Sequence, residues 1–309
     1  MPALGIDTSN YTTSAALFDG VNVLQKKQPL PVKPGALGLR QSDALFHHTM
    51  QVPALLEELL CEDGARGLGE ITAIGVSDRP RAVEGSYMPC FLAGVAAARS
   101  IAAALHVPLC KVSHQQGHLA AALFSAQRLD LLTGEFLAFH VSGGTTEGLR
   151  IAPNLQATRV CGSADLKAGQ LLDRVGVLLG YAFPAGAALD RLSRGGVLTR
   201  KIKMSMDDAG CHLSGIENQC KQMLEQGAAR ETIARHCMES VAAALLEMVS
   251  YTLKQCGKLP LVFAGGVCCS EVIRERIYER YPNAMFAEPI FSADNAAGTA
   301  ILALESSPL

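Results

Sequence analysis

Two histidines one helical turn apart are the sharpest chemical signal in the sequence. His114 and His118 stand in the run SHQQGH, which begins at Ser113. Side chains at positions i and i+4 project from the same face of a helix, so two imidazoles at this spacing can bind one metal ion. The chain contains eight histidines, so a chance pair is also an ordinary explanation. Two imidazoles are too few ligands for a metal site, so at least a third ligand has to come from elsewhere.

A carboxylate near the C-terminus is a candidate for that third ligand. Asp294 follows Phe291, Ser292 and Ala293 and precedes an Ala-rich stretch that predicts a final helix. Carboxylates are favoured at helix N-termini, where they accept hydrogen bonds from unpaired amides. The residues alone therefore leave Asp294 open as a metal ligand or as an N-cap.

Two glycine-rich turns could hold a phosphate through their backbone amides. Ser142, Gly143 and Gly144 lie between two apolar runs, and Gly265 with Gly266 ends a third. Glycine lets the backbone approach a ligand closely, and amides at the start of a helix favour anions. Each turn could equally be an ordinary bend. No Walker motif or GxGxxG sequence offers a competing nucleotide site.

A hydroxyl-rich bend near the N-terminus adds Thr8 and Ser9 as candidates for a phosphate loop. Together with the glycine turns it suggests a phosphate cradle between two lobes. Ser142 is not in a GxSxG elbow, and small buried filler is the commoner role for cysteines such as Cys268 and Cys269. The catalytic residues therefore stay unassigned.

The elements that must position these groups follow from hydrophobic periodicity. Hairpins are expected over residues 3–19 and 136–151, and a strand and turn over 261–267. Two similar hairpins about half a chain apart indicate duplicated lobes. Helices with Ala-rich faces that suit packing on a sheet are expected at 44–60, 94–105, 114–126, 167–179, 230–256, 270–281 and 295–304.

Composition narrows the class of protein. The 309 residues are 49% hydrophobic and 18% charged, which indicates a well-filled core. The 27 Lys and Arg against 29 Asp and Glu give a net charge of -2, so there is no global attraction to nucleic acid or anionic membranes. Ten cysteines without a CxxC pair and an N-terminus without a secretory signal favour a cytoplasmic protein. The apolar stretch 91–110 suits a buried helix better than a membrane span.

A series of motifs runs in one order along nearly the whole chain. They are GIDTS (5–9), His48 with Pro53 and LLEE (55–58), KVSHQQGHL (111–119), VSGG (141–144), DLKAGQLLDR (165–174), PAG (184–186), LSG (213–215), AGGV (264–267) and SADNAA (292–297). This order resembles the TsaD-type threonylcarbamoyl transferases, formerly called O-sialoglycoprotein endopeptidases. HxxxH lacks the Glu of HExxH, so the older activity has no obvious general base here.

The resemblance implies a two-lobed α/β fold of the actin-like ATPase class, which also includes sugar kinases and heat-shock chaperone ATPases, with a cleft. It implies an N-terminal lobe over 1–110, closed by a C-terminal helix at 295–309, and a C-terminal lobe over 111–294 with the metal and nucleotide motifs. It also implies that one iron or zinc ion is held by His114, His118 and Asp294. Nucleotide or substrate contacts carry over to Ser142, Gly143, Gly144, Asp173, Gly186, Gly265, Gly266 and Ser270.

The activity implied by the resemblance is the transfer of a threonylcarbamoyl group from threonylcarbamoyl-AMP to the anticodon-adjacent adenosine of a tRNA. AMP or ATP are the other adenylates that would fit. A TsaB-like subunit and an accessory ATPase are the implied partners, and a homodimer stays open. A chain of net charge -2 should bind tRNA poorly alone. The basic residues Arg79 and Arg81 and the basic segment 191–203 are the candidates for RNA contact.

Several residues depart from the family pattern while the metal ligands and phosphate glycines are kept. Arg79-Pro80-Arg81 stands where the family has a GPG loop. The other altered positions are Tyr11, Thr12, Thr145, Leu166, Gln170 and Ser270. Two alternatives therefore remain: a paralogue that transfers a carbamoyl-type group to another acceptor, and a noncatalytic nucleotide-binding partner subunit.

Overall fold

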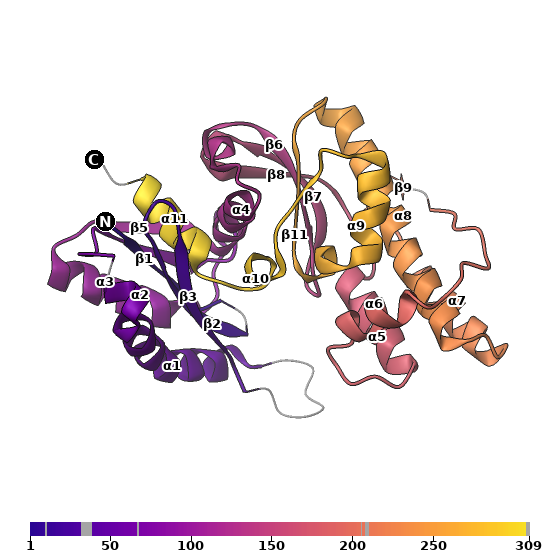
Figure 1. The fold of residues 1–309 in the computed structure, drawn as a ribbon, viewed down its shortest axis with the longest axis horizontal. Helices are drawn as coiled ribbons and strands as arrows, with labels where there is room; N and C mark the ends of the chain where they lie inside the picture. Colours follow the sequence, from indigo (N-terminus) through magenta and orange to yellow (C-terminus); the bar gives the residue numbers. More distant parts are fainter. Residues whose placement is uncertain (10, 32–38, 67, 205, 208–209, 307–309) are drawn as a thin grey trace. The chain divides into compact units, whose positions relative to one another are not determined.

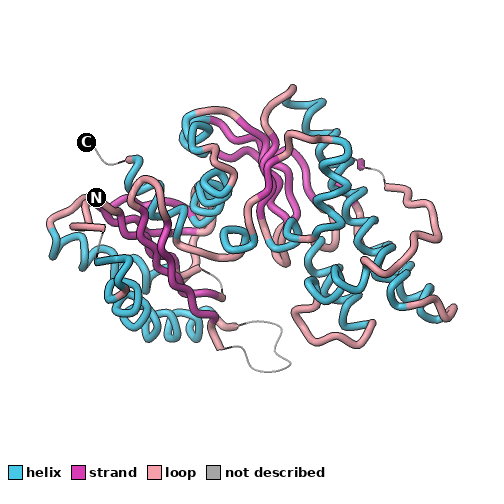
Figure 2. The backbone as a smooth tube through the Cα atoms, in the orientation of Figure 1, coloured by secondary structure: helices cyan, strands magenta, loops and turns pink. Residues whose placement is uncertain are grey.

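The computed structural model describes residues 1–9, 11–31, 39–66, 68–204, 206–207 and 210–306. The chain forms two compact units. Unit 1 comprises residues 1–129 and 293–309, and unit 2 comprises residues 130–292. Each unit is built on a five-stranded sheet with helices packed against it (Figures 1 and 2), which confirms the expected α/β class.

The sheet of unit 1 has the order β3-β2-β1-β4-β5. Strands β1, β2 and β3 form an antiparallel meander, whereas β4 pairs parallel with both β1 and β5. The strands are β1 (Ala3–Asp7), β2 (Thr12–Phe18), β3 (Val23–Pro29), β4 (Ala73–Arg79) and β5 (Leu109–Ser113). The helices are α1 (Gln41–Cys61), α2 (Asp63–Arg66), α3 (Phe91–Leu105), α4 (His114–Ser125) and α11 (Ala297–Glu305).

Side chains along β1 alternate between the two faces of this sheet, and each face contacts different helices. Leu4 and Ile6 are buried in a core cluster with residues of α1 and α3. Gly5 points to the opposite face, where a Cβ would lie 2.5 Å from the carbonyl oxygen of Ala296, directly before α11. Because side chains two residues apart share a face, Asp7 lies on the α11 side with Gly5.

Helices α4 and α11 touch backbone to backbone on that side of the sheet. A Cβ on Gly298 would overlap the carbonyl oxygen of Gly117. This close crossing explains why the first unit continues to Leu129, whereas the sequence suggested a boundary after residue 110. The C-terminal helix belongs to the same unit; residues 307–309 of the expected range 295–309 lie outside the described residues.

Unit 2 repeats the strand arrangement with the order β12-β11-β6-β7-β8. Here β6, β7 and β8 form the antiparallel meander, and β11 pairs parallel with β6 and β12. The repeated topology confirms the duplication that the two hairpins predicted. The five strands are β6 (Phe136–Val141), β7 (Thr146–Ala152), β8 (Gln156–Gly162), β11 (Leu261–Ala264) and β12 (Met285–Phe286).

The helices of unit 2 cover a core in which Phe139, Phe263 and Phe286 stack across three neighbouring parallel strands. They are α5 (Ala168–Leu178), α6 (Gly186–Ser193), α7 (Ser214–Glu225), α8 (Arg230–Cys256), α9 (Glu271–Arg280) and α10 (Pro289–Ser292). A short ribbon, β9 (Met206–Asp207) and β10 (Gly210–Cys211), and the 3-10 turns η1 (Leu129–Thr133), η2 (Pro153–Leu155) and η3 (Gly266–Cys269) complete the described elements. Within the part of the chain that the structure describes, no helix has the length and apolar character needed to span a bilayer.

Candidate metal centre and glycine turns

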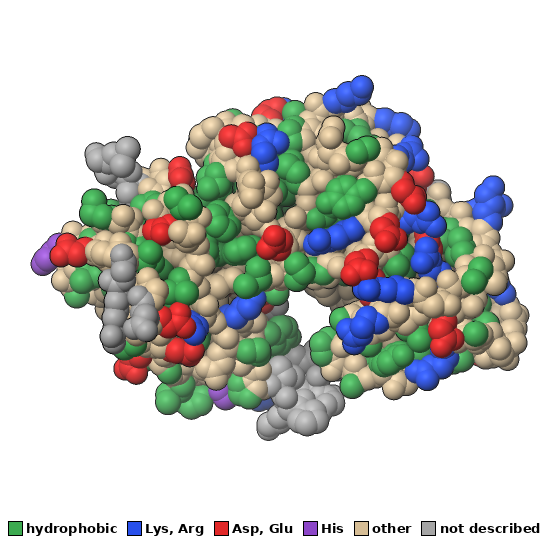
Figure 3. Space-filling model, in the orientation of Figure 1, with side chains coloured by type: hydrophobic (Ala, Val, Ile, Leu, Met, Phe, Trp, Pro, Cys, Tyr) green, Lys and Arg blue, Asp and Glu red, His purple; other side chains and the backbone are tan. Residues whose placement is uncertain are grey.

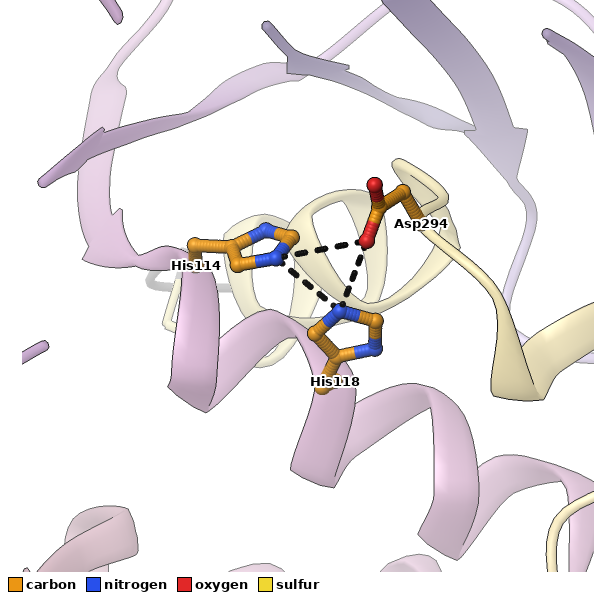
Figure 4. A group of neighbouring side chains, drawn as sticks. All are labelled: His114, His118 and Asp294. Carbon is orange, nitrogen blue, oxygen red and sulfur yellow. Dashed lines mark hydrogen bonds and ion pairs between the residues drawn. The ribbon is translucent and has the colours of Figure 1, made fainter. Parts of the chain in front are cut away.

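The start of α4 positions the two histidines. Strand β5 runs directly into this helix at Ser113, whose Oγ accepts a hydrogen bond from Gln116 N at 3.2 Å. Gln116 Oε1 in turn accepts one from Ser113 N at 2.9 Å. This reciprocal cap fixes the first turn. His114 is the first helical residue and His118 lies one turn later, so both imidazoles project from the same face (Figure 4).

Asp294 meets these histidines from the other end of the chain. Its Oδ1 lies 3.6 Å from His114 Nε2 and 3.4 Å from His118 Nε2, and the two Nε2 atoms are 3.0 Å apart (Figure 4). The amide of Ala297, the first residue of α11, donates instead to Asn295 Oδ1 at 3.0 Å. The side chain of Asp294 is thus directed at the imidazoles, while Asn295 accepts the hydrogen bond from the first amide of α11.

These three residues offer one ligand atom each, and all three atoms lie within 4.8 Å of one another. Imidazole nitrogens with a carboxylate oxygen are ligands that both Zn²⁺ and non-haem iron accept. Three protein ligands leave a coordination position open, as in catalytic zinc sites. Asp294 keeps 22% of its side chain exposed, so the group can be reached from solvent. The donor set therefore fits a divalent metal ion.

The carboxylates and imidazoles of this group stabilise one another's charged forms. Burial alone would lower the pKa of His114, but the neighbouring carboxylates of Asp7 and Asp294 raise it to about 10, so a metal ion bound at Nε2 would have to replace a proton there. Burial would raise the pKa of Asp294, whereas hydrogen bonds and charge from the two histidines hold that pKa well below its usual range. Asp294 is therefore kept ionised, the state in which a carboxylate binds a metal ion.

Asp7 is the member of this cluster that sequence reasoning missed. Its Oδ2 accepts hydrogen bonds from His114 Nδ1 at 3.0 Å and from the Ser77 hydroxyl. Its Oδ1 accepts from Ser9 N at 2.8 Å and from the Ser9 hydroxyl. Asp7 is only 1% exposed. A carboxylate directly after the buried run at 4–6 was the one signal for it, because its imidazole partner is 107 residues away.

Thr8 and Ser9, the candidates for an N-terminal phosphate loop, are both buried within unit 1. Thr8 Oγ1 donates to Cys90 O at 3.0 Å and accepts from Gly94 N at 3.1 Å, which fastens the hairpin to α3. The Ser9 hydroxyl donates to Asp7, as described above. Both hydroxyls therefore bond within unit 1, and the Ser9 hydroxyl also lies 3.5 Å from His114 Nε2.

In unit 2 the two glycine turns lie side by side. Strands β6 and β11 run parallel in register and end at the same edge, so the turns that follow them are neighbours. Gly265 has φ +99, and a Cβ there would overlap the carbonyl oxygen of Val141, which directly precedes the other turn. Only glycine fits this position without strain.

The exposed backbone of these turns is open to a ligand. Gly143, Gly144 and Gly266 are exposed, and a Cβ on any of them would meet nothing within 4 Å. The turn after β6 is closed by Ser142 N, which donates to Thr145 O at 2.7 Å. The start of α5 packs against this turn, because Gly169 N donates to Ser142 O at 3.2 Å. Glycine amides thus stand beside a helix N-terminus, an arrangement that can bind an anion.

The other candidate nucleotide contacts lie in the helical part of unit 2. Asp173 Oδ1 accepts from Ala185 N at 2.8 Å and from Gly186 N at 3.2 Å, so it closes the start of α6. The Ser270 hydroxyl donates to Asp190 and accepts from Ile273 N, which caps α9. Ser270 is buried and its hydroxyl is used in this cap, whereas Gly186 has open space around it.

The positions that depart from the family pattern divide between the two units. In unit 1, Tyr11 is 39% exposed and Thr12 begins β2. In unit 2, Leu166 is buried in the core. Gln170 Oε1 accepts from the amide that precedes α5, and Thr145 N donates to Ser142 Oγ at 3.1 Å. The changed residues therefore include both structural and exposed positions.

The basic residues singled out for RNA contact are partly neutralised by carboxylates. Arg79 ends β4 and its guanidinium donates to Asp78 at 2.6 Å. Within 191–203, Arg194 pairs with Asp190 at 2.9 Å and with Glu271 at 2.7 Å. On the face drawn in Figure 3, Lys and Arg side chains gather over unit 2, with Asp and Glu among them. The surface there has mixed charge.

Known proteins are similar to this chain in sequence and in fold. The family model described as TsaD, tRNA N6-adenosine threonylcarbamoyltransferase, matches residues 33–301. A protein of that name from Methanopyrus kandleri is 28% identical over 96% of this chain and 85% of its own length. One from Thermus thermophilus is 29% identical over 98% of this chain and 92% of its own length.

The solved structure of Acidaminococcus fermentans (R)-2-hydroxyglutaryl-CoA dehydratase component A matches with a TM-score of 0.58 and 14% identity, over 99% of this chain and 98% of that one. This likeness shows the fold alone, the two-lobed α/β fold of actin-like ATPases. The family match covers both the histidines of α4 and the glycine turns of unit 2. The chain belongs to the TsaD family of tRNA N6-adenosine threonylcarbamoyltransferases.

Proposed function

We propose that this transferase moves a threonylcarbamoyl group from threonylcarbamoyl-AMP to the adenosine beside the anticodon of a tRNA. The exocyclic N6 attacks the carbamoyl carbon, the bond from that carbon to the phosphate oxygen breaks, and AMP leaves. N6 loses one proton as the new C–N bond forms. Membership of the TsaD family supports the reaction class.

The observation that carries the proposal is the convergence of His114, His118 and Asp294 at a place that solvent reaches. We assign these residues as ligands of one iron or zinc ion. When bound, such an ion supplies a Lewis acid that orients the donor and stabilises developing negative charge. Asp294 is ionised and both imidazoles project from one face of α4, so binding would require loss of the proton at His114 Nε2 but no rearrangement of the helix.

The glycine turns of unit 2 are assigned to the adenylate. The exposed amides of Gly143, Gly144 and Gly266 can donate to phosphate oxygens, and stabilise the departing phosphate as an oxyanion hole does. Asp173 uses one oxygen for two amides, and a carboxylate has further acceptor capacity for a ribose hydroxyl. Gly186 borders the same carboxylate and leaves room for a ligand.

Partner proteins are part of this proposal. Phosphate contacts supply most nonspecific affinity for nucleic acid, and the chain has a net charge of -2 with its arginines partly paired. We therefore expect a TsaB-like subunit and an accessory ATPase to assist tRNA binding and turnover. A tRNA substrate would place the enzyme in the cytoplasm.

The test is a turnover assay with threonylcarbamoyl-AMP, unmodified tRNA and the candidate partners, read by mass spectrometry of the digested nucleosides. The native chain should yield the threonylcarbamoyl nucleoside, and His118→Ala should yield none. His106→Asn is the matched control, because His106 is exposed at the end of α3 with φ 54, which asparagine tolerates. Absence of product from the native chain would refute the proposal.

A different acceptor is the second candidate, favoured by the residues that depart from the family pattern. Tyr11, in place of an acidic residue of the family pattern, is 39% exposed and so can contact a substrate. The same assay with free nucleosides and small amines in place of tRNA separates the two acceptors. A noncatalytic subunit would show neither product nor stoichiometric metal.

A further inference from the structure

The carboxylate of Asp7 contacts His114 at the ring nitrogen that does not face Asp294 and His118. His114 presents Nε2 towards Asp294 and His118, and its other ring nitrogen, Nδ1, lies 3.0 Å from Asp7 Oδ2. The two nitrogens of an imidazole ring are separated by one carbon, and their outward directions diverge widely. A group bound at Nδ1 therefore cannot reach an ion bound at Nε2, and Asp7 is not placed as a further ligand.

We propose that Asp7 is a positioning residue for the metal centre, acting through His114. This inference rests on the proposed assignment of His114, His118 and Asp294 as metal ligands. By accepting the Nδ1 proton, Asp7 fixes the tautomer in which the Nε2 lone pair faces the metal position. The same hydrogen bond fixes the ring plane and makes Nε2 a stronger donor.

The structure holds Asp7 itself in a single orientation. Ser77 on β4 donates to Oδ2, while Ser9 donates to Oδ1 through both its amide and its hydroxyl. Each carboxylate oxygen is thus tied to a different part of unit 1. Asp7 is 1% exposed, so water competes little for these bonds.

Strand alternation explains why the carboxylate and the imidazole meet. Asp7 and Ser77 are both on the sheet face that contacts α11, and α4 crosses α11 on that face. His114 begins α4 directly after β5, the strand beside β4. The sheet therefore sets the orientation of His114, whereas the α4–α11 crossing sets its distance from Asp294.

The test measures metal affinity by isothermal titration with Zn²⁺, in the absence of tRNA and donor. Asp7→Asn should weaken binding by about 10–100-fold, the range for loss of such a partner. Ser77→Ala removes only one bond to the carboxylate and should weaken binding by a smaller factor. Ser14→Ala is the matched control, because its buried hydroxyl donates to the backbone oxygen of Asp7 and not to the carboxylate.

The visible spectrum of the Co²⁺-loaded protein separates positioning from a purely structural role. Asp7→Asn should shift the Co²⁺ absorption bands with the number of protein ligands unchanged, whereas Ser14→Ala should leave the bands in place. If Asp7→Asn and Ser77→Ala both bind Zn²⁺ as tightly as Ser14→Ala, the inference is wrong. Should Asp7→Asn fail to fold, the affinity of Ser77→Ala decides alone.

Different results would contradict the proposed metal centre and this inference. Loss of Zn²⁺ binding in His118→Ala with unchanged binding in Asp7→Asn and Ser77→Ala overturns only the role of Asp7. Unchanged binding in His118→Ala overturns the ligand assignment and, with it, the basis of the inference.

Discussion

The two units present different chemistry from the same strand arrangement. Strand β1 of unit 1 corresponds to β6 of unit 2, and β4 corresponds to β11, since each pair has the same neighbours in the same directions. At the end of β1 and near the end of β4, unit 1 has the polar side chains of Asp7 and Ser77. At the ends of β6 and β11, unit 2 has exposed glycine backbone.

One topology can therefore provide two kinds of candidate site. The proposed metal site in unit 1 depends on particular side chains from β1, α4 and the segment before α11, so we expect loss of one proposed ligand to remove it. The turns of unit 2 depend on backbone shape, so they should tolerate side-chain changes but not a Cβ at a crowded glycine. The following variants test that contrast.

The largest effect should come from the metal ligands. We expect His114→Ala and His118→Ala each to abolish metal retention, because a site of three protein ligands keeps little affinity with two. Metal analysis of protein purified without chelators measures this, and circular dichroism should show that the variants remain folded. Unchanged metal content in both variants would remove the site from unit 1.

Gly265→Ala should destabilise unit 2 by roughly 1–3 kcal/mol, the usual cost of overpacking. The added Cβ would overlap the carbonyl oxygen of Val141, and φ +99 strains any L side chain. Urea unfolding gives the free energy. Gly266→Ala is the control next in sequence, since its Cβ would meet nothing within 4 Å, and it should stay within about 0.5 kcal/mol of the native chain. Equal stability of the two variants would contradict the packing argument.

Asp165→Asn should lower the free energy of unfolding by about 1.5–3 kcal/mol at pH 7, the range for hydrogen bonds to a charged group. Burial would raise the pKa of Asp165, but the Ser214 hydroxyl and the amides of Leu213, Leu166 and Ser214 hold it well below its usual range. The carboxylate is stabilising above pH 3.8, and this contribution is lost as the pH falls below that value.

Denaturant titrations at neutral and acid pH measure this difference between the native chain and Asp165→Asn. The gap in unfolding free energy should shrink as the solution is acidified. The exposed Glu225, at the end of α7, offers the control Glu225→Gln, for which little change is expected at either pH. A gap that grows on acidification would show that the sign of the pKa shift is wrong.

Ser113→Ala should have the smallest effect, about 1 kcal/mol, because it removes the N-cap of α4 but no metal ligand. Thermal unfolding measures the loss. Ser100→Ala, in the exposed middle of α3, is the comparison and should be close to neutral. If Ser113→Ala proves as harmless as Ser100→Ala, the cap does not stabilise the helix that carries the histidines.

Much of the fold could be predicted from periodicity, and the exceptions have physical reasons. The helix expected at 230–256 is α8, Arg230–Cys256, because a long, strongly patterned segment leaves little choice. Helices α6 and α7 were not predicted; α7 has few apolar residues, of which Ile216, Cys220 and Met223 are buried. Strands β4, β5 and β8 were not predicted either. Strand β3 was missed because its sequence, VLQKKQP, is polar and charged and its residues are half-buried or exposed.

The candidate site could be predicted only where the signal was local or came from family resemblance. The spacing of His114 and His118 lies within one helix, so the sequence reveals it directly. Asp294 needed the resemblance, because a carboxylate before a helix is also a common cap. Asp7 could not be found, since its role depends on the pairing of β1 with β4 and on the crossing of two helices distant in sequence.

The contact between Gly117 and Gly298 has a consequence for how this protein can change over time. With no side chain at the point of closest approach, the separation of the two helix axes is near its lower limit and cannot be adjusted by small substitutions. A single methyl group at residue 298 would push α11 away and carry Asp294 with it, although all three ligands would still be present. Inspection of the three side chains alone would therefore classify such a descendant as intact, although the proposed metal site would have lost its geometry.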